Sequence, residues 1–248
     1  MLMSRQRIDT FLVKIGQAES RSKAQALILA GEVTADGKTV SHPALMVTDK
    51  TVVKLIERPP YVSRGGIKLC SALDHFDLDV TGKVAVDIGA STGGFTDCLL
   101  QRGAKKVYAV DVGYGQLDYR LRLDPRVVVM ERVNARHPFS LPEKTDLAAM
   151  DVSFISVEKV IPNIALHLAE HGFLIVLVKP QFEVGKGEVG RGGVVKDPQL
   201  HAKVLGHLVV WAVCQGFRIG GLTSSPILGP AGNREFFILL RPQQNLRQ

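Results

Sequence analysis

The sequence lacks long apolar runs and paired cysteines, and each absence excludes a class of protein. The longest apolar run, Leu208 to Cys214, is too short to span a bilayer, and the first residues lack the apolar block of a secretory signal. Cys70, Cys98 and Cys214 lie far apart with no Cys-x-x-Cys pair, which fits neither a zinc site nor a disulfide framework. We therefore expect a cytoplasmic protein without membrane contact or metal site, whose cysteines are buried.

Acidic residues are outnumbered, with 24 Asp and Glu against 31 Lys and Arg, and the net charge is +7. Such a balance favours a polyanionic partner. Residues 1–58 carry nine basic residues against six acidic ones, and residues 67–248 carry twenty-one against eighteen. Because the excess is spread over both parts, neither part resembles a simple basic tail.

Residues 1–58 predict a small α+β unit. Apolar residues recur at helical spacing over residues 8–15, and Gly16 is placed to end that helix. Ser20 can cap a second helix that ends near Gly31. An Asp-Gly pair between short β-type runs then predicts a hairpin over residues 33–40, and the run TVVKLI predicts a closing strand.

This first unit resembles the ribosomal-protein-S4-type RNA-binding domain. The resemblance rests on the Arg-Ile-Asp start, on Ser-Arg-Ser-Lys-Ala at the second helix, and on Gly-Glu-Val with the Asp-Gly turn. It implies that basic helix faces grip the RNA backbone, which positions a protein without reading sequence. The pattern alone also allows an ordinary solvated helical face. The implied RNA contacts here are Arg5, Arg7, Arg21 and Lys23, with Arg21 and Lys23 the best candidates.

Two prolines and two glycines in residues 59–66 interrupt both periodicities and predict a linker. Residues 67–248 then alternate apolar five- to eight-residue runs with segments of helical spacing such as residues 157–170. That alternation predicts an α/β domain with a mainly parallel sheet covered by helices on both faces. The predicted strands are residues 83–88, 106–112, 126–130, 146–151 and 173–180.

The glycine-rich stretch DIGASTGGFT, residues 87–96, follows the first predicted strand, where ligands bind in such sheets. It matches neither a P-loop nor Gly-x-Gly-x-x-Gly, so a phosphate cradle is the weaker interpretation. Asp87 would repel a pyrophosphate but could attract a cation, and Asp111, ending the second strand, could accept two ribose hydroxyls. A nucleoside with a cationic, phosphate-free tail, S-adenosyl-L-methionine, fits both carboxylates. Strand-end turn residues are the alternative.

At these residues the chain resembles the FtsJ-like class of RNA ribose methyltransferases. The resemblance implies a Rossmann-like class I methyltransferase with a seven-stranded, mainly parallel sheet, and S-adenosylmethionine as cofactor. Asn134 falls where that fold contacts adenine, although it could equally be a turn residue. The remaining predicted cofactor contacts are Gly89, Ser91, Thr92, Gly93, Gly94, Phe95 and Thr96.

Four charged residues near strand ends are the catalytic candidates: Lys68, Asp151, Lys179 and Glu235. Taken singly, each has an equally good structural explanation as a linker charge, a helix cap, a strand-end lysine or a solvent-facing residue. Together they match the Lys-Asp-Lys-Glu tetrad of the FtsJ-like class. The resemblance implies that the carboxylates orient the ammonium groups and that Lys179 lies nearest the target 2′-hydroxyl.

The segment after Lys179 is rich in glycine and is either a flexible excursion or a lid that orders on RNA. Phe182 could stack on a base there or belong to the core. Arg64, Lys186 and Arg191 are further predicted RNA contacts.

The whole chain resembles the TlyA family, sometimes labelled haemolysins, through VSRGGIKL and DIGASTGGFTDCLL. This resemblance implies cytidine 2′-O-methylation of ribosomal RNA, with ribosomal RNA or ribosomal subunits as partner and no DNA. The rival hypotheses are a membrane-lytic protein, an RNA-binding scaffold with an inactive methyltransferase fold, and a base methyltransferase. The oligomeric state, the target nucleotide and the subunit stay open.

Overall fold

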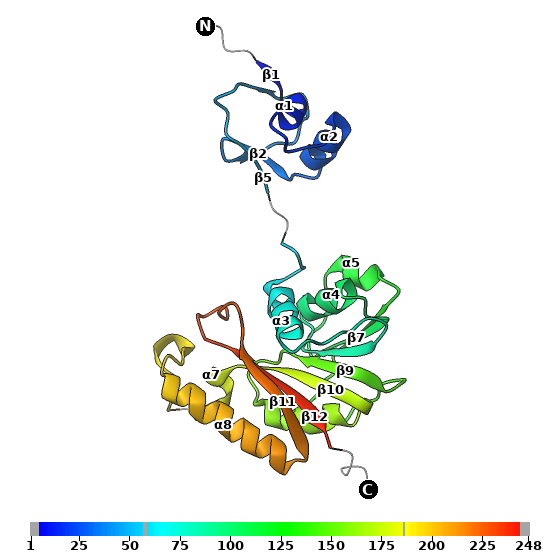
Figure 1. The fold of residues 1–248 in the computed structure, drawn as a ribbon, viewed down its shortest axis with the longest axis vertical. Coiled ribbons are helices and arrows are strands. Elements are labelled where there is room, and N and C mark those ends of the chain that lie inside the picture. Colours follow the sequence, from blue (N-terminus) through cyan, green and yellow to red (C-terminus); the bar gives the residue numbers. More distant parts are fainter. Residues whose placement is uncertain (1–4, 57–58, 186, 244–248) are drawn as a thin grey trace. The chain divides into compact units, whose positions relative to one another are not determined.

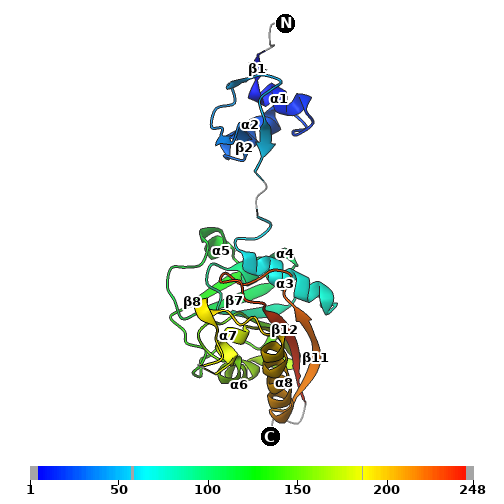
Figure 2. The ribbon, with the colours of Figure 1, turned by 90° about the vertical axis from the view of Figure 1, so that its left-hand side faces the viewer.

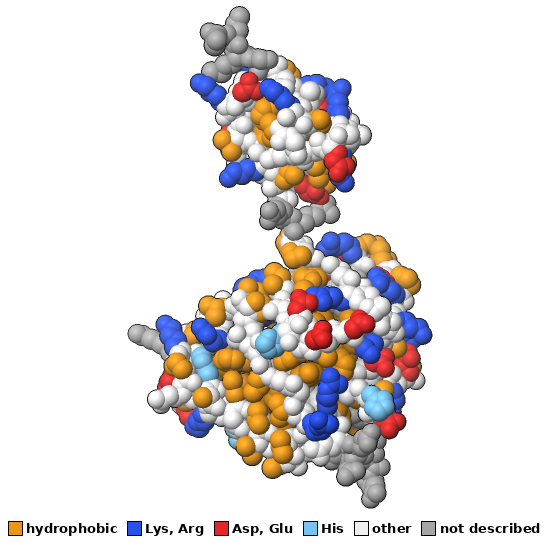
Figure 3. Space-filling view, viewed as in Figure 1, with side chains coloured by type: hydrophobic (Ala, Val, Ile, Leu, Met, Phe, Trp, Pro, Cys, Tyr) orange, Lys and Arg blue, Asp and Glu red, His pale blue; other side chains and the backbone are white. Residues whose placement is uncertain are grey.

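A computed structural model describes residues 5–56, 59–185 and 187–243. The chain divides into two compact units, residues 1–59 and 60–248 (Figures 1 and 2). Lys and Arg side chains are scattered over the visible faces of both units (Figure 3), as the even distribution of charge along the sequence predicts.

The N-terminal unit packs two helices against short strands around a core that includes Ile8, Leu12, Ile28 and Val33. The Ser20 hydroxyl caps the second helix by accepting from the Lys23 N–H at 3.2 Å, which confirms the predicted cap. The predicted hairpin is also confirmed, since β2 and β3 pair in an antiparallel manner. The elements are β1 (Gln6–Arg7), α1 (Ile8–Lys14), α2 (Arg21–Leu29), β2 (Val33–Ala35), β3 (Lys38–Thr39), β4 (Met46–Val47) and β5 (Val53–Leu55).

The C-terminal unit is built on a seven-stranded sheet in the order β11-β12-β10-β9-β6-β7-β8. Strands β10, β9, β6, β7 and β8 run parallel, and β12 pairs antiparallel with both β10 and β11. The mainly parallel sheet is therefore confirmed. The strands are β6 (Val84–Ile88), β7 (Lys106–Asp111), β8 (Val127–Glu131), β9 (Thr145–Met150), β10 (Leu168–Val178), β11 (Phe217–Ser224) and β12 (Phe236–Pro242).

Helices cover both faces of this sheet (Figures 1 and 2). The sheet separates two hydrophobic cores, one on each face. Successive side chains of β6 alternate between them, since Ala85 packs in the first core and Val86 in the second. The first core includes side chains of α3 (Arg64–His75), α4 (Gly94–Gln101) and α5 (Tyr119–Leu123). The second includes side chains of α6 (Ile161–Ala165) and α8 (Pro198–Cys214). Short turns η1 (Val157–Lys159), α7 (Pro180–Glu183) and η2 (Arg191–Gly193) complete the unit.

Three sequence-based predictions differ from the structure. Helix α3 begins at Arg64, so the end of the predicted linker is the first turn of a helix whose apolar face joins the core. The helix expected over residues 157–170 is short, because Leu168 pairs with Thr145 and already begins β10. Cys98 is buried as predicted, but Cys70 is half-buried and Cys214, the last residue of α8, is exposed.

Candidate active site

The glycine loop after β6 comes into close contact with the end of β9. Gly89 has φ +81°, and a Cβ at this position would lie 2.5 Å from the Asp151 carbonyl oxygen. Gly93, with φ +96°, immediately precedes α4, and a Cβ there would overlap Leu121. Only glycine fits both positions, and the loop backbone is thereby held against the carboxyl edge of the sheet.

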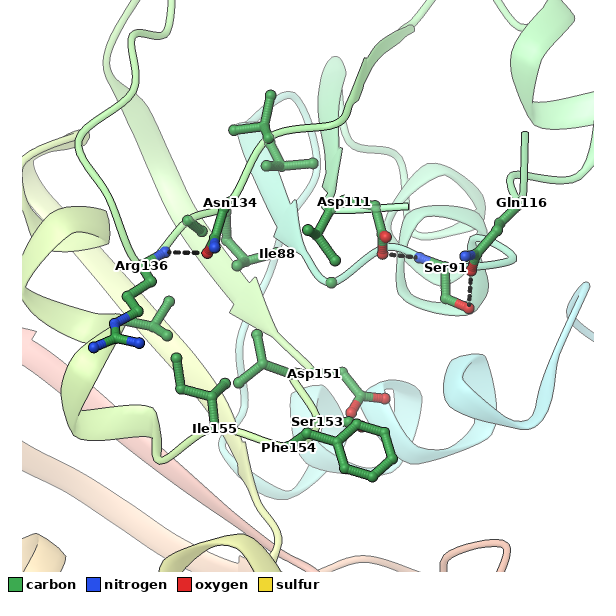
Figure 4. A pocket seen from close by; sticks show the side chains of 17 residues that line it. Ile88, Ser91, Asp111, Gln116, Asn134, Arg136, Asp151, Ser153, Phe154 and Ile155 are labelled. Atoms are coloured by element: carbon green, nitrogen blue, oxygen red, sulfur yellow. Dashed lines mark hydrogen bonds between the residues drawn. The ribbon is translucent and has the colours of Figure 1, made fainter. Parts of the chain in front are cut away.

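A cavity of about 510 Å³ opens beside this loop. Figure 4 shows Asp111 and Asn134 along one side and Asp151 and Phe154 along the other. The Asp111 carboxylate accepts from the N–H groups of Ser91 (2.8 Å) and Gly113 (2.6 Å). These bonds fix the carboxylate, and each of its oxygens keeps a second lone pair with which to accept a hydroxyl.

Asn134 serves a turn and lines the cavity at once. Its side-chain oxygen accepts from the Arg136 N–H at 3.1 Å, as in an Asx-turn, so the turn role that the sequence left open is present. Apolar walls of Val110, Val133 and Ile155 adjoin it. An apolar lining beside an amide side chain suits an adenine ring, whose polar edge Asn134 could contact.

Asp87 lies beneath the loop and is fully buried. One carboxylate oxygen accepts from the Thr96 N–H (2.8 Å) and hydroxyl (2.7 Å), and the other has no hydrogen-bond partner among the described residues. Burial raises the pKa of Asp87 to about 7; the bonds from Thr96 oppose this rise, and the charges of Asp151 and Asp111 add to it. Asp87 is not among the described residues that line this cavity or the neighbouring cavity, which is described below. It therefore acts on the site through the loop above it.

Asp111, together with Asp87 in its ionised form, gives the glycine loop a negative potential that favours a cation over a phosphate. The apolar walls, the fixed Asp111 carboxylate and this potential fit S-adenosylmethionine, whose tail carries a sulfonium. Of the other predicted cofactor residues, Thr92, Gly94 and Phe95 line the neighbouring cavity instead. Thr96 is buried and binds Asp87, so it positions the loop.

The four catalytic candidates form two ion pairs in that neighbouring cavity, which measures about 410 Å³. Lys68 Nζ lies 2.5 Å from Glu235 Oε2, and Lys179 Nζ lies 2.6 Å from Asp151 Oδ1. Lys179 also donates to the Ser153 hydroxyl at 2.7 Å. All four side chains line the cavity.

The sheet topology explains this convergence. Asp151 and Lys179 follow the parallel strands β9 and β10, whose carboxyl ends share one edge. Glu235 precedes β12, and because β12 is antiparallel its first residue, Phe236, pairs with Val178 at that same edge. The two cavities share Gly89, Ser91 and Asp151, so a reacting group in one would face a ligand in the other.

Phe154 and Ser153 belong to the site although the sequence analysis did not single them out. Phe154 is 90% exposed and has φ +63°, an unusual backbone conformation for a large side chain. Its ring lies 5.0 Å from the Phe182 ring, and Lys179 Nζ lies 6.0 Å from the Phe182 centroid. An aromatic residue four positions after the apolar strand β9 was the one signal that the sequence offered.

The predicted RNA-binding residues are distributed over both units. Arg5, Arg21 and Lys23 are exposed and Arg7 is half-buried, and both Arg7 and Arg21 contact the buried Asp9. Arg64 lines the cavity of the ion pairs and donates to the Leu228 carbonyl at 2.5 Å. Lys186 lies outside the described residues, and of Arg191 only the backbone, in η2, is described.

The glycine-rich segment after α7 is attached to neighbouring elements. Glu188 pairs with Lys203 of α8 at 2.5 Å, and the Val195 N–H donates to Asn233 at 2.9 Å. Phe182 is half-buried against Phe154, which leaves both its stacking role and its core role as predictions. Within the described ranges, no helix has the length and apolar character to cross a membrane, and no three His, Cys, Asp or Glu side chains gather as a metal site.

Comparison with known proteins accounts for both units. Residues 61–242 match the FtsJ-like methyltransferase family, and residues 6–53 match the S4 domain. The chain is 47% identical to the 16S/23S rRNA (cytidine-2′-O)-methyltransferase TlyA of Mycobacterium tuberculosis, over 96% of this chain and 91% of that protein. It is 44% identical to Hemolysin A of Brachyspira hyodysenteriae, over 93% of this chain and 97% of that protein.

A solved structure agrees with this assignment. The structure of a hemolysin candidate from Streptococcus thermophilus superimposes with a TM-score of 0.72 and 42% identity, covering 98% of this chain and 92% of that one. The chain therefore belongs to the FtsJ-like methyltransferases, in the TlyA family, and it carries an S4 domain before its methyltransferase domain.

Proposed function

We propose that the protein transfers a methyl group from S-adenosylmethionine to the 2′-hydroxyl of a cytidine in ribosomal RNA, in the cytoplasm. The observation that supports this most strongly is the pair of cavities that share Gly89, Ser91 and Asp151. One has the features of a nucleoside site and the other holds two lysine–carboxylate ion pairs. The names of the TlyA relatives supply the cytidine and the ribosomal RNA.

The cofactor supplies an electrophilic methyl group, so the chain has to place a hydroxyl in line with it and to manage a proton. Lys179 is suited to bind the ribose hydroxyl, since Asp151 and Ser153 hold its ammonium group in place. A lysine is a poor base at neutral pH, because its ordinary pKa is about 10.4. We therefore assign Lys179 to orienting the hydroxyl and stabilising the alkoxide charge, with the proton released to water.

Lys68 and Glu235 form the second, more buried pair, and both line the same cavity as Lys179 and Asp151. Their ion pair joins α3 to the segment before β12. This link holds α3 against the start of β12, so the pair organises the site while Lys179 contacts the substrate.

The S4 domain supplies the docking function in this proposal. Its basic side chains contact the phosphate backbone of ribosomal RNA, alone or within a subunit, and thereby hold the target ribose near Lys179. Backbone contacts position an RNA without selecting its sequence. Selection of the cytidine then falls to the methyltransferase cavity and to the exposed ring of Phe154 beside it.

The experiment is methyl transfer from tritiated S-adenosylmethionine to ribosomal RNA, followed by nucleoside analysis. We expect 2′-O-methylcytidine from the natural chain, and a loss of roughly 10²- to 10⁴-fold in Lys179→Ala with cofactor binding retained. Lys105→Ala removes an exposed lysine elsewhere on the same unit and should leave the rate unchanged. A base-methylated product, or a fully active Lys179→Ala chain, would refute the proposal.

A further inference from the structure

The N-terminal unit contains a fully buried carboxylate, Asp9 in α1, at the centre of a polar network. Arg7 donates to both of its oxygens, from Nε at 3.1 Å and from Nη2 at 2.9 Å. Arg21 donates from Nε at 3.0 Å, Gln25 from its side-chain amide at 2.9 Å, and the Thr10 N–H at 2.8 Å. Two arginines from different elements are thus tied to one point.

This network keeps Asp9 ionised. The hydrogen bonds from Arg7 are the largest cause that holds the pKa of Asp9 far below its usual range, and those from Gln25 and Arg21 add to the effect against the opposing influence of burial. A buried charge is tolerated only when it is paired and hydrogen-bonded, so Asp9 constrains the guanidinium groups around it. Arg7 and Arg21 nevertheless stay 39% and 56% exposed.

We propose that Asp9 is a positioning residue that holds Arg7 and Arg21 as one preformed site for a single phosphate of the RNA backbone. A guanidinium has five N–H donors. The contacts with Asp9 use Nε and Nη2 of Arg7 and Nε of Arg21, which leaves donors on both side chains for an anion. Because Asp9 has already restricted both long side chains, less conformational entropy is lost when the phosphate binds.

The inference rests on the proposed function, because it takes RNA as the ligand. It predicts an effect opposite in sign to simple electrostatics. Asp9→Asn removes a negative charge from a protein that binds a polyanion, so overall charge alone would strengthen RNA binding. Loss of the positioning carboxylate should instead weaken binding, roughly tenfold, and lower the slope of log K against log salt by about one.

Asp49→Asn is the matched control. Asp49 lies in the same unit and also pairs with a basic residue, Lys14 at 3.1 Å, but its side chain is 63% exposed. This variant makes the same change in net charge without touching the network around Asp9. We expect its affinity for RNA to equal or slightly exceed that of the natural chain.

The measurement is fluorescence anisotropy of the full-length chain with labelled 16S and 23S ribosomal RNA transcripts over a range of salt concentrations, with thermal unfolding of each variant recorded alongside. If Asp9→Asn does not fold, the single variants Arg7→Lys and Arg21→Lys test the inference instead. Lysine keeps the positive charge but cannot make the planar contacts of a guanidinium. Each should bind RNA several-fold more weakly, with the fold intact.

The outcomes separate this inference from the proposed function. A natural chain that methylates ribosomal RNA, together with a folded Asp9→Asn variant that binds as tightly as Asp49→Asn, overturns the inference alone. The inference is also overturned if both lysine variants bind RNA as tightly as the natural chain. A natural chain that does not methylate ribosomal RNA overturns the proposed function, whatever the binding results are.

Discussion

Removal of Lys68 and removal of Lys179 should affect stability very differently, because their ion pairs differ in burial. Lys68 is 6% exposed and Glu235 is 1% exposed. In the other pair, the Asp151 side chain is 22% exposed. Water can therefore solvate Asp151 after its lysine is removed, but it cannot reach Glu235 without a structural change.

Lys68→Met leaves an uncompensated buried carboxylate and should lower the free energy of unfolding of the C-terminal unit by about 3–5 kcal/mol. Lys179→Met should cost about 1 kcal/mol, as for a partly solvated pair. The double variant Lys68→Met/Glu235→Leu removes both buried charges and keeps similar volumes, so it should recover most of the loss and lie within about 1–2 kcal/mol of the natural chain. All three variants should lack methyl transfer.

Urea unfolding monitored by the fluorescence of Trp211, the single tryptophan, reports on the C-terminal unit. Equal m-values among the variants would allow the midpoints to be compared as stabilities. Equal costs for Lys68→Met and Lys179→Met would contradict the reasoning from burial. A double variant less stable than Lys68→Met would show that Glu235 contributes by more than its charge.

Three further predictions concern the cofactor and the substrate. Asp111→Ala should weaken S-adenosylmethionine binding by about 1.5–3 kcal/mol through loss of charge-assisted hydrogen bonds, and unchanged affinity in calorimetry would refute the ribose assignment. Because burial raises the pKa of Asp87 to about 7, and ionised Asp87 attracts a cation, affinity for cationic S-adenosylmethionine should rise between pH 6 and pH 8. Neutral S-adenosylhomocysteine should show a smaller rise, and equal pH slopes would exclude the electrostatic role. Phe154→Ala should raise the KM for RNA by a factor equivalent to about 1–3 kcal/mol of base stacking, without changing cofactor affinity in calorimetry.

Sheet geometry explains why the cofactor cavity could be anticipated from the sequence. The carboxyl ends of parallel strands share one edge, so Asp111 and the glycine loop were expected to lie together once the strand–helix alternation was recognised. The structure places both on the cavity of about 510 Å³. Asp87 was expected to face the ligand, yet it is fully buried and holds Thr96. Strand alternation identifies the edge of the sheet, whereas the direction of a strand-end side chain depends on the turn that follows.

The ion pairs show a second limit of pattern reasoning. No local sequence pattern relates Lys68 to Glu235, because they lie 167 residues apart in the sequence. In the structure, Lys68 Nζ nevertheless lies 2.5 Å from Glu235 Oε2. Only the resemblance to a known tetrad brought these residues together. No resemblance identified the network around Asp9. A carboxylate in a short helix that also carries a lysine is expected to be solvated, and only the structure shows that Asp9 is buried.

The direction of β12 decides the composition of the catalytic cavity. A parallel final strand would place its first residue at the amino edge of the sheet, far from Lys179. Because β12 is antiparallel, Phe236 pairs with Val178 and the preceding Glu235 reaches the carboxyl edge, where it meets Lys68 from α3. Two carboxylates and two ammonium groups therefore line one cavity together with the glycine loop, whose Gly89 leaves no room for a Cβ against Asp151.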